Sequence, residues 1–80
     1  MIVKFIITKN GRIIFGTRPA NEEFHADIAK NNDILLNEVA GGGRADLEKK
    51  SIFGSSTAFG KYDYKTVKKA LPEWKVERTS

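Results

Sequence analysis

Two apolar β-branched segments joined by an Asn-Gly dipeptide open the chain and constrain the fold most. Residues 1–8 and 13–15 are rich in Ile, Val and Phe, and residues 10–11 are Asn-Gly. β-Branched and aromatic residues favour strands, and Asn-Gly readily adopts positive φ at both centres of a two-residue turn. The pattern predicts an antiparallel hairpin in which Ile6 lies opposite Phe15.

The rest of the chain alternates between short helical and extended patterns. The predicted elements are a helix from Asn21 to about Lys30, strands at 34–39 and 47–53, a helix at 64–71 capped by Asp63 and a strand at 74–78. The order ββαββαβ predicts an α+β fold with one mixed sheet packed by two helices. Eighty residues without a linker predict a single domain spanning residues 1–80.

Composition excludes several classes of site. The chain has no Cys and one His, which excludes a disulfide framework, a thiolate nucleophile and a metal site built on several His or Cys. No apolar run approaches the ~20 residues of a membrane span, so we expect a cytoplasmic chain without a membrane partner. We also expect the chain to be a monomer. Residues 41–80 hold nine Lys and Arg against five Asp and Glu, which accounts for the whole net charge of +4. A basic half attracts anions, although it is equally consistent with a solvated face.

Two glycine-rich segments could bring backbone close to a ligand. Three glycines at 41–43 precede Arg44, and they are typical either of a close backbone approach or of a flexible linker. Residues 54–60 read Gly-Ser-Ser-Thr-Ala-Phe-Gly, a loop rich in hydroxyls and backbone N–H groups that suits an oxyanion. The loop lacks the Lys-Ser/Thr ending of a Walker loop, and it is also consistent with a plain surface loop.

Two side chains have both a structural and a functional interpretation. Lys4 interrupts an apolar strand opposite Thr17 in the predicted hairpin, either as a rim lysine or as a cation directed into a site. Phe24 and Ile28, four positions apart, form the apolar stripe of the first predicted helix, and His25 flanks this stripe, either as a border residue or as an acid–base group.

Three segments in this order resemble the Janus/Ocnus family of phosphohistidine phosphatases. They are Phe-His-Ala-Asp-Ile at 24–28, Gly-Gly-Gly-Arg at 41–44 and Phe-Gly-Ser-Ser-Thr-Ala-Phe-Gly at 53–60. The resemblance covers nearly the whole chain and implies hydrolysis of a phosphoramidate P–N bond without a metal or other cofactor.

The resemblance also implies roles for individual residues. His25 matches the histidine that acts as general base on water, and Arg44 matches the arginine after the glycines. The implied phosphate-binding residues are Lys4, Ser55, Ser56, Thr57 and Ala58, through the Ser56 hydroxyl and the loop N–H groups. Arg18 lies one residue out of step with a further family arginine and would need a bulge at Gly16 to reach the site.

The chain departs from the family in two other respects. The segment between the first two strands is reduced to a tight turn, and Asp63-Tyr64 stands where the family often has Asp-His. The second histidine of such a site is therefore lost.

Three functional hypotheses follow, with different partners. The first is a phosphohistidine phosphatase acting on a phosphorylated protein side chain. The alternative is a non-catalytic module that binds phosphate or a phosphorylated residue. The third is a single-stranded nucleic-acid binder, which would use the basic half and its aromatics; these are Phe53, Phe59, Tyr62, Tyr64 and Trp74. The chain has no RNA-binding signature, which argues against the third hypothesis.

Overall fold

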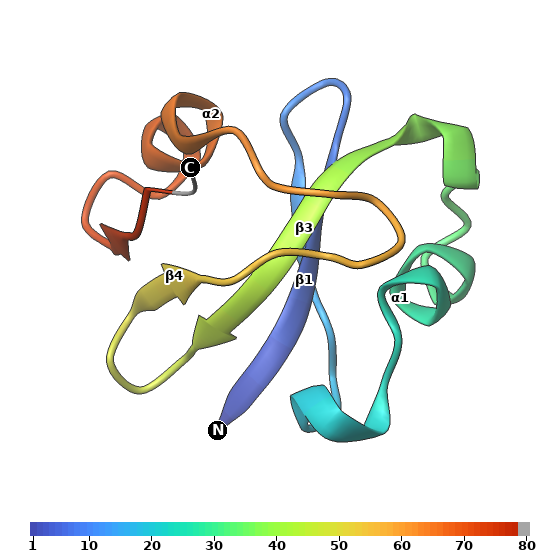
Figure 1. The fold of residues 1–80 in the computed structure, drawn as a ribbon, viewed down its shortest axis with the longest axis horizontal. Helices are drawn as coiled ribbons and strands as arrows, with labels where there is room; N and C mark the ends of the chain where they lie inside the picture. The colour runs from blue at the N-terminus through green and yellow to red at the C-terminus, as the bar shows by residue number, and fades with distance from the viewer. Residues whose placement is uncertain (79–80) are drawn as a thin grey trace.

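The computed structural model of the chain describes residues 1–78, and in this range five strands form one sheet in the order β2-β1-β3-β4-β5 (Figure 1). The elements are β1 (Ile2–Thr8), β2 (Ile13–Phe15), α1 (His25–Asn31), β3 (Val39–Asp46), β4 (Ser51–Phe53), α2 (Tyr64–Ala70) and β5 (Lys75–Val76). The β4–β5 pair is parallel and the other pairs are antiparallel. The predicted α+β class and its mixed sheet with two helices are confirmed. Residues 79 and 80 of the predicted domain lie outside the described residues.

Side chains alternate along β1, so each face of the sheet has its own hydrophobic core. Phe5 and its neighbours on one face pack with Val67 of α2. Ile6, on the opposite face, packs with Ile28 of α1. Figure 1 shows the two helices on opposite sides of the central pair β1 and β3. Lys4 shares the α1 face with Ile6 because the two residues are two positions apart.

The β1–β2 hairpin forms, but its predicted register is wrong by one residue. Phe5, not Ile6, lies opposite Phe15. The loop has three residues, because the Thr8 N–H donates to the Arg12 carbonyl at 2.9 Å and only Gly11, at φ +87°, takes a left-handed conformation. A type I turn followed by a left-handed glycine gives this longer hairpin loop.

The first helix begins at His25, so its predicted start at Asn21 is wrong. Residues 20–22 form one turn of 3₁₀ helix, and the next residue, Glu23, is extended and buried. Its Oε1 accepts from the Thr17 N–H at 3.2 Å, which holds the chain against the sheet before the helix can start. At the observed start of α1, the Phe24 N–H donates to Asp27 Oδ2 at 3.2 Å, which satisfies one of the free donors at the helix N-terminus.

The glycine run lies inside β3, not after a strand at 34–39 as predicted. Leu36–Glu38 forms a 3₁₀ turn, and β3 extends from Val39 to Asp46. A Cβ added to Gly42 would lie 2.6 Å from the Phe5 carbonyl oxygen and 2.8 Å from His25 Cδ2. The glycine is therefore required for close approach of β1 and the histidine ring.

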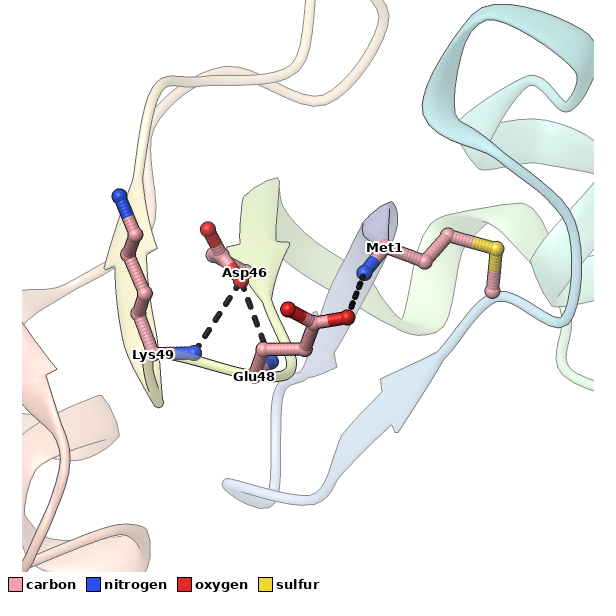
Figure 2. A network of polar contacts seen from close by, with 4 residues as sticks. All are labelled: Met1, Asp46, Glu48 and Lys49. Carbon is pink, nitrogen blue, oxygen red and sulfur yellow. Dashed lines mark hydrogen bonds and ion pairs between the residues drawn. The ribbon is translucent and has the colours of Figure 1, made fainter.

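A turn occupies the first half of the strand predicted at 47–53, so β4 begins at Ser51. Figure 2 shows the reason: Asp46 Oδ1 accepts from the N–H groups of Glu48 and Lys49, at 3.1 and 3.2 Å. Lys50 then takes a left-handed conformation at φ +52°, which directs the chain back along β3. The N-terminal amino group pairs with Glu48 at 3.6 Å on the same turn.

The C-terminal elements follow the sequence more closely. Asp63 caps α2 as predicted, since its Oδ2 accepts from the Thr66 N–H at 3.0 Å. The last strand is shorter than predicted and pairs only over Lys75–Val76. Within residues 1–78 no helix is both long enough and apolar enough to cross a membrane.

Candidate functional site

A cavity of about 510 Å³ opens where three segments that are distant in the sequence meet. They are the β1–β3 pair, the start of α1 and the loop after β4. In Figure 1 this loop crosses β3 toward α1 before the chain returns to α2. The lining residues are Lys4, Phe24, His25, Ala26, Arg44, Ser55, Thr57 and Ala58. Six of the candidate residues named from the sequence thus lie around one cavity.

Lys4 and Arg44 place two positive charges side by side in the cavity wall. They are directly opposite each other in the β1–β3 register and therefore share a sheet face. Like charges in such a pair destabilise a sheet by roughly 0.2–1 kcal/mol. Neither cation has a carboxylate partner within residues 1–78, and Asp46 on the same face is engaged by the turn N–H groups. An unpaired cationic pair at this position favours an anionic ligand.

The hydrogen bond of His25 fixes the tautomer of its neutral ring. Nε2 lies 3.0 Å from the carbonyl oxygen of Gly43. A carbonyl oxygen can only accept, so Nε2 carries the proton and donates it. The lone pair of the neutral imidazole is therefore on Nδ1, which is the nitrogen able to accept a proton from a ligand or from water.

The surroundings of His25 keep the ring neutral. The residue is 7% exposed, and burial is the main cause that lowers its pKa below the ordinary value of 6.5. The hydrogen bond to Gly43 opposes this shift, whereas the charges of Lys4 and Arg44 add to it. At neutral pH the ring is therefore an available base within a cationic cavity.

We expect the imidazole of His25, the chain's single histidine, to titrate with a midpoint below 6.5. As the pH falls, the unfolded chain takes up this proton first, so the free energy of unfolding decreases below about pH 6.5 and levels off below the folded-state pKa. An NMR pH titration of the ring measures the midpoint. In an Arg44→Gln variant the midpoint should rise, because one repelling charge is lost; a midpoint at or above 6.5 in the parent would contradict this account.

In the loop after β4, some backbone N–H groups form hydrogen bonds within the loop and others remain available to a ligand. Ser56 is buried, its N–H donates to the Gly60 carbonyl at 3.0 Å, and its Oγ accepts from the Phe59 N–H. The N–H groups of Ser55, Thr57 and Ala58 have no hydrogen-bond partner within residues 1–78. The donors available to a ligand are thus on the neighbours of Ser56, while the N–H of Ser56 closes the loop.

Two candidate residues do not line the cavity, and two lining residues were not singled out as site residues. Ser56 belongs to the loop but is buried, and Arg18 is exposed outside the cavity. The bulge that Arg18 would need at Gly16 does not form, because the Gly16 N–H continues the ladder to the Lys4 carbonyl at 2.8 Å. Phe24, predicted to lie on the apolar stripe of the first helix, instead precedes α1 and is 73% exposed, with Lys4 Nζ 5.3 Å from its ring centroid.

Most of the aromatics considered for nucleic-acid stacking are used in packing. Tyr62 is buried, and its ring lies 5.6 Å from that of Phe5. Trp74 stacks on Phe15 at 5.5 Å, and Phe59 packs against the core beneath α1. Rings engaged in this way are not free to stack on successive bases.

Gly42→Ala is expected to displace the His25 ring as well as destabilise the fold. The new Cβ would overlap the ring and the β1 backbone, and overpacking typically costs about 1–3 kcal/mol. Gly41→Ala is the matched control, since its Cβ would overlap the Lys61 carbonyl oxygen and meet the backbone of Tyr62 rather than the histidine, and Gly41 makes no hydrogen bond to His25. Denaturant unfolding should show a loss of stability in both variants. NMR should show a shifted imidazole titration only in Gly42→Ala; equal shifts in both would refute the role assigned to Gly42.

The chain matches no protein-family model, no curated protein and no solved structure. The likeness to the Janus/Ocnus family thus remains a resemblance of motifs. Within residues 1–78 no group of three or more His, Cys, Asp or Glu side chains could hold a metal ion.

Proposed function

We propose that this chain is a phosphohistidine phosphatase that needs no metal ion, with His25 as general base. The observation that carries the proposal is the unpaired cross-strand pair of Lys4 and Arg44 beside a buried, neutral imidazole in one cavity. Such a pair costs stability when empty and is compensated when a dianionic phosphoryl group binds.

In the proposed complex the phosphoryl oxygens lie between the two cations and the loop. The Arg44 guanidinium can bind two oxygens at once, and the Lys4 ammonium adds a second charge. The free N–H groups of Ser55, Thr57 and Ala58 supply neutral donors. Phosphoryl transfer needs this stabilisation of charge on the equatorial oxygens more than covalent help from the protein.

In the hydrolytic step, His25 Nδ1 accepts a proton from water as the water oxygen forms its bond to phosphorus. The P–N bond breaks on the opposite side, and its electron pair stays on the leaving nitrogen. The products are inorganic phosphate and the free amine or imidazole, and His25 returns its proton to solvent. Attack by Nδ1 itself, with a phosphorylated enzyme as intermediate, is the competing route. Radiolabelled phosphate trapped on the quenched protein would show that competing route.

The lining of the cavity favours phosphohistidine among phosphoramidates. Among residues 1–78 the lining contains no carboxylate, so it offers no carboxylic acid to protonate a departing amine. A phosphohistidine ring protonated on its second nitrogen leaves directly as neutral imidazole. An alkylamine such as that of phospholysine needs a proton on the nitrogen that bears phosphorus. The proposed substrate is therefore phosphohistidine in a protein or peptide.

The same lining also suits a module that binds phosphate without hydrolysing it, because the described residues that line the cavity include one histidine and no acid. A single assay separates the two functions: release of phosphate from phosphohistidine in the presence of EDTA. Turnover supports the phosphatase. Saturable phosphate binding without turnover by the folded parent rejects it in favour of the binding module.

A further inference from the structure

A second hollow, of about 380 Å³, lies beside the cavity and shares Arg44 with it. Its other lining residues are Met1, Ile2, Pro19, Ala20 and Asn21. Except for Asn21, these side chains are apolar. Ile2 is 44% exposed although it belongs to a central strand, so a β-branched apolar side chain is left open to solvent next to the cationic pair.

The sheet sets the distance between the two hollows. Ile2 and Lys4 lie two positions apart on β1 and share a face, opposite Asp46 and Arg44 on β3. Alternate residues of a strand are separated by about 6.6 Å. An extended peptide has the same repeat, so a peptide that runs along β1 with its phosphorylated side chain at Lys4 places the side chain two positions away over Ile2.

We propose that the hollow at Ile2 binds an apolar side chain two positions from the phosphohistidine of a protein substrate. This inference rests on the proposed function, because the phosphoryl group sets the register. Arg44 would contact both parts of the ligand, its guanidinium on the phosphoryl group and its stem along the apolar hollow. Because Arg44 lines both hollows, the two are continuous, and one peptide can occupy both.

Peptides with phosphohistidine at the centre test the inference. Each peptide carries Leu, Ser or Glu two positions before or after the phosphohistidine, and free phosphohistidine is the reference substrate. We expect at least one Leu peptide to have a kcat/KM about 10-fold above that of its Ser counterpart, as for one well-buried apolar group. Peptides with a carbon-linked, non-hydrolysable phosphohistidine analogue give the same comparison as dissociation constants, independently of turnover.

Two matched variants test whether the hollow at Ile2 causes the preference for Leu over Ser. Ile2→Thr keeps a β-branched residue in the strand and should reduce the Leu-to-Ser ratio to near one. Leu36→Thr alters an equally exposed apolar residue (47%) outside both hollows and should leave the ratio unchanged. Turnover of free phosphohistidine without any Leu preference overturns this inference and leaves the proposed function standing. If neither free phosphohistidine nor any of the phosphohistidine peptides is hydrolysed, the proposed function fails, and the dissociation constants of the analogues alone then decide the inference.

Discussion

Replacing His25 with alanine is expected to lower kcat for phosphohistidine hydrolysis by about 10²–10⁴-fold, the usual contribution of a general base. The expectation rests on the cavity position of the ring and on its neutral state, with the lone pair on Nδ1. Steady-state release of phosphate from phosphohistidine, with parent and variant assayed side by side, measures the loss. KM should change less than kcat, because the proton is accepted in the transition state.

His25→Gln is the matched control for folding. The Gln side chain can place an N–H near the position of Nε2 and keep the hydrogen bond to the Gly43 carbonyl, but it supplies no base. We expect this variant to unfold at nearly the parent denaturant midpoint and to be as inactive as the alanine variant. Activity near the parent level in a folded His25→Gln protein would remove His25 from the mechanism.

Replacing Arg44 with glutamine is expected to lower kcat/KM by about 10²–10³-fold, as for the loss of one donor to a developing oxyanion. The same change should raise the stability of the unliganded protein by roughly 0.2–1 kcal/mol at low salt, because the repulsion from Lys4 disappears. Opposite effects on stability and activity are expected of a residue kept for function at a cost to the fold. Denaturant unfolding and phosphohistidine kinetics measure the two effects.

Arg18→Gln provides the matched loss of one positive charge. Arg18 is exposed and does not line the cavity, so its replacement should change neither stability nor kcat/KM appreciably. A loss of activity as large as that of Arg44→Gln would show that the net charge of the chain matters, not the cross-strand pair.

Local sequence signals predicted the parts of the fold that local interactions determine. The hairpin and the Asp63-capped helix depend on neighbours within a few residues, and both form. The start of α1 depends instead on Glu23 reaching back to the Thr17 N–H beside Gly16. The place of the glycine run depends on Phe5 and His25 packing against it. Neither contact is visible in a helical or alternating pattern.

The residues of the candidate site could be predicted from the sequence, but the contacts and hydrogen bonds between them could not. The motifs named His25, Arg44 and the loop, while only the backbone pairing reveals that Lys4 lies opposite Arg44. The composition of the loop could not show that the Ser56 N–H is used internally and leaves its neighbours free. Phe24 was not predicted as a site residue because an aromatic residue four positions before Ile28 fits the buried face of a helix.

A titration of the ¹⁵N-labelled parent with inorganic phosphate tests most directly whether Lys4, His25, Arg44 and the loop form one anion site. The expected result is saturable shift changes in the imidazole of His25 and in the amides of Ser55, Thr57 and Ala58, all with one dissociation constant that weakens in Arg44→Gln. Saturable changes confined to other residues, or none at these groups in the folded protein, would contradict the account.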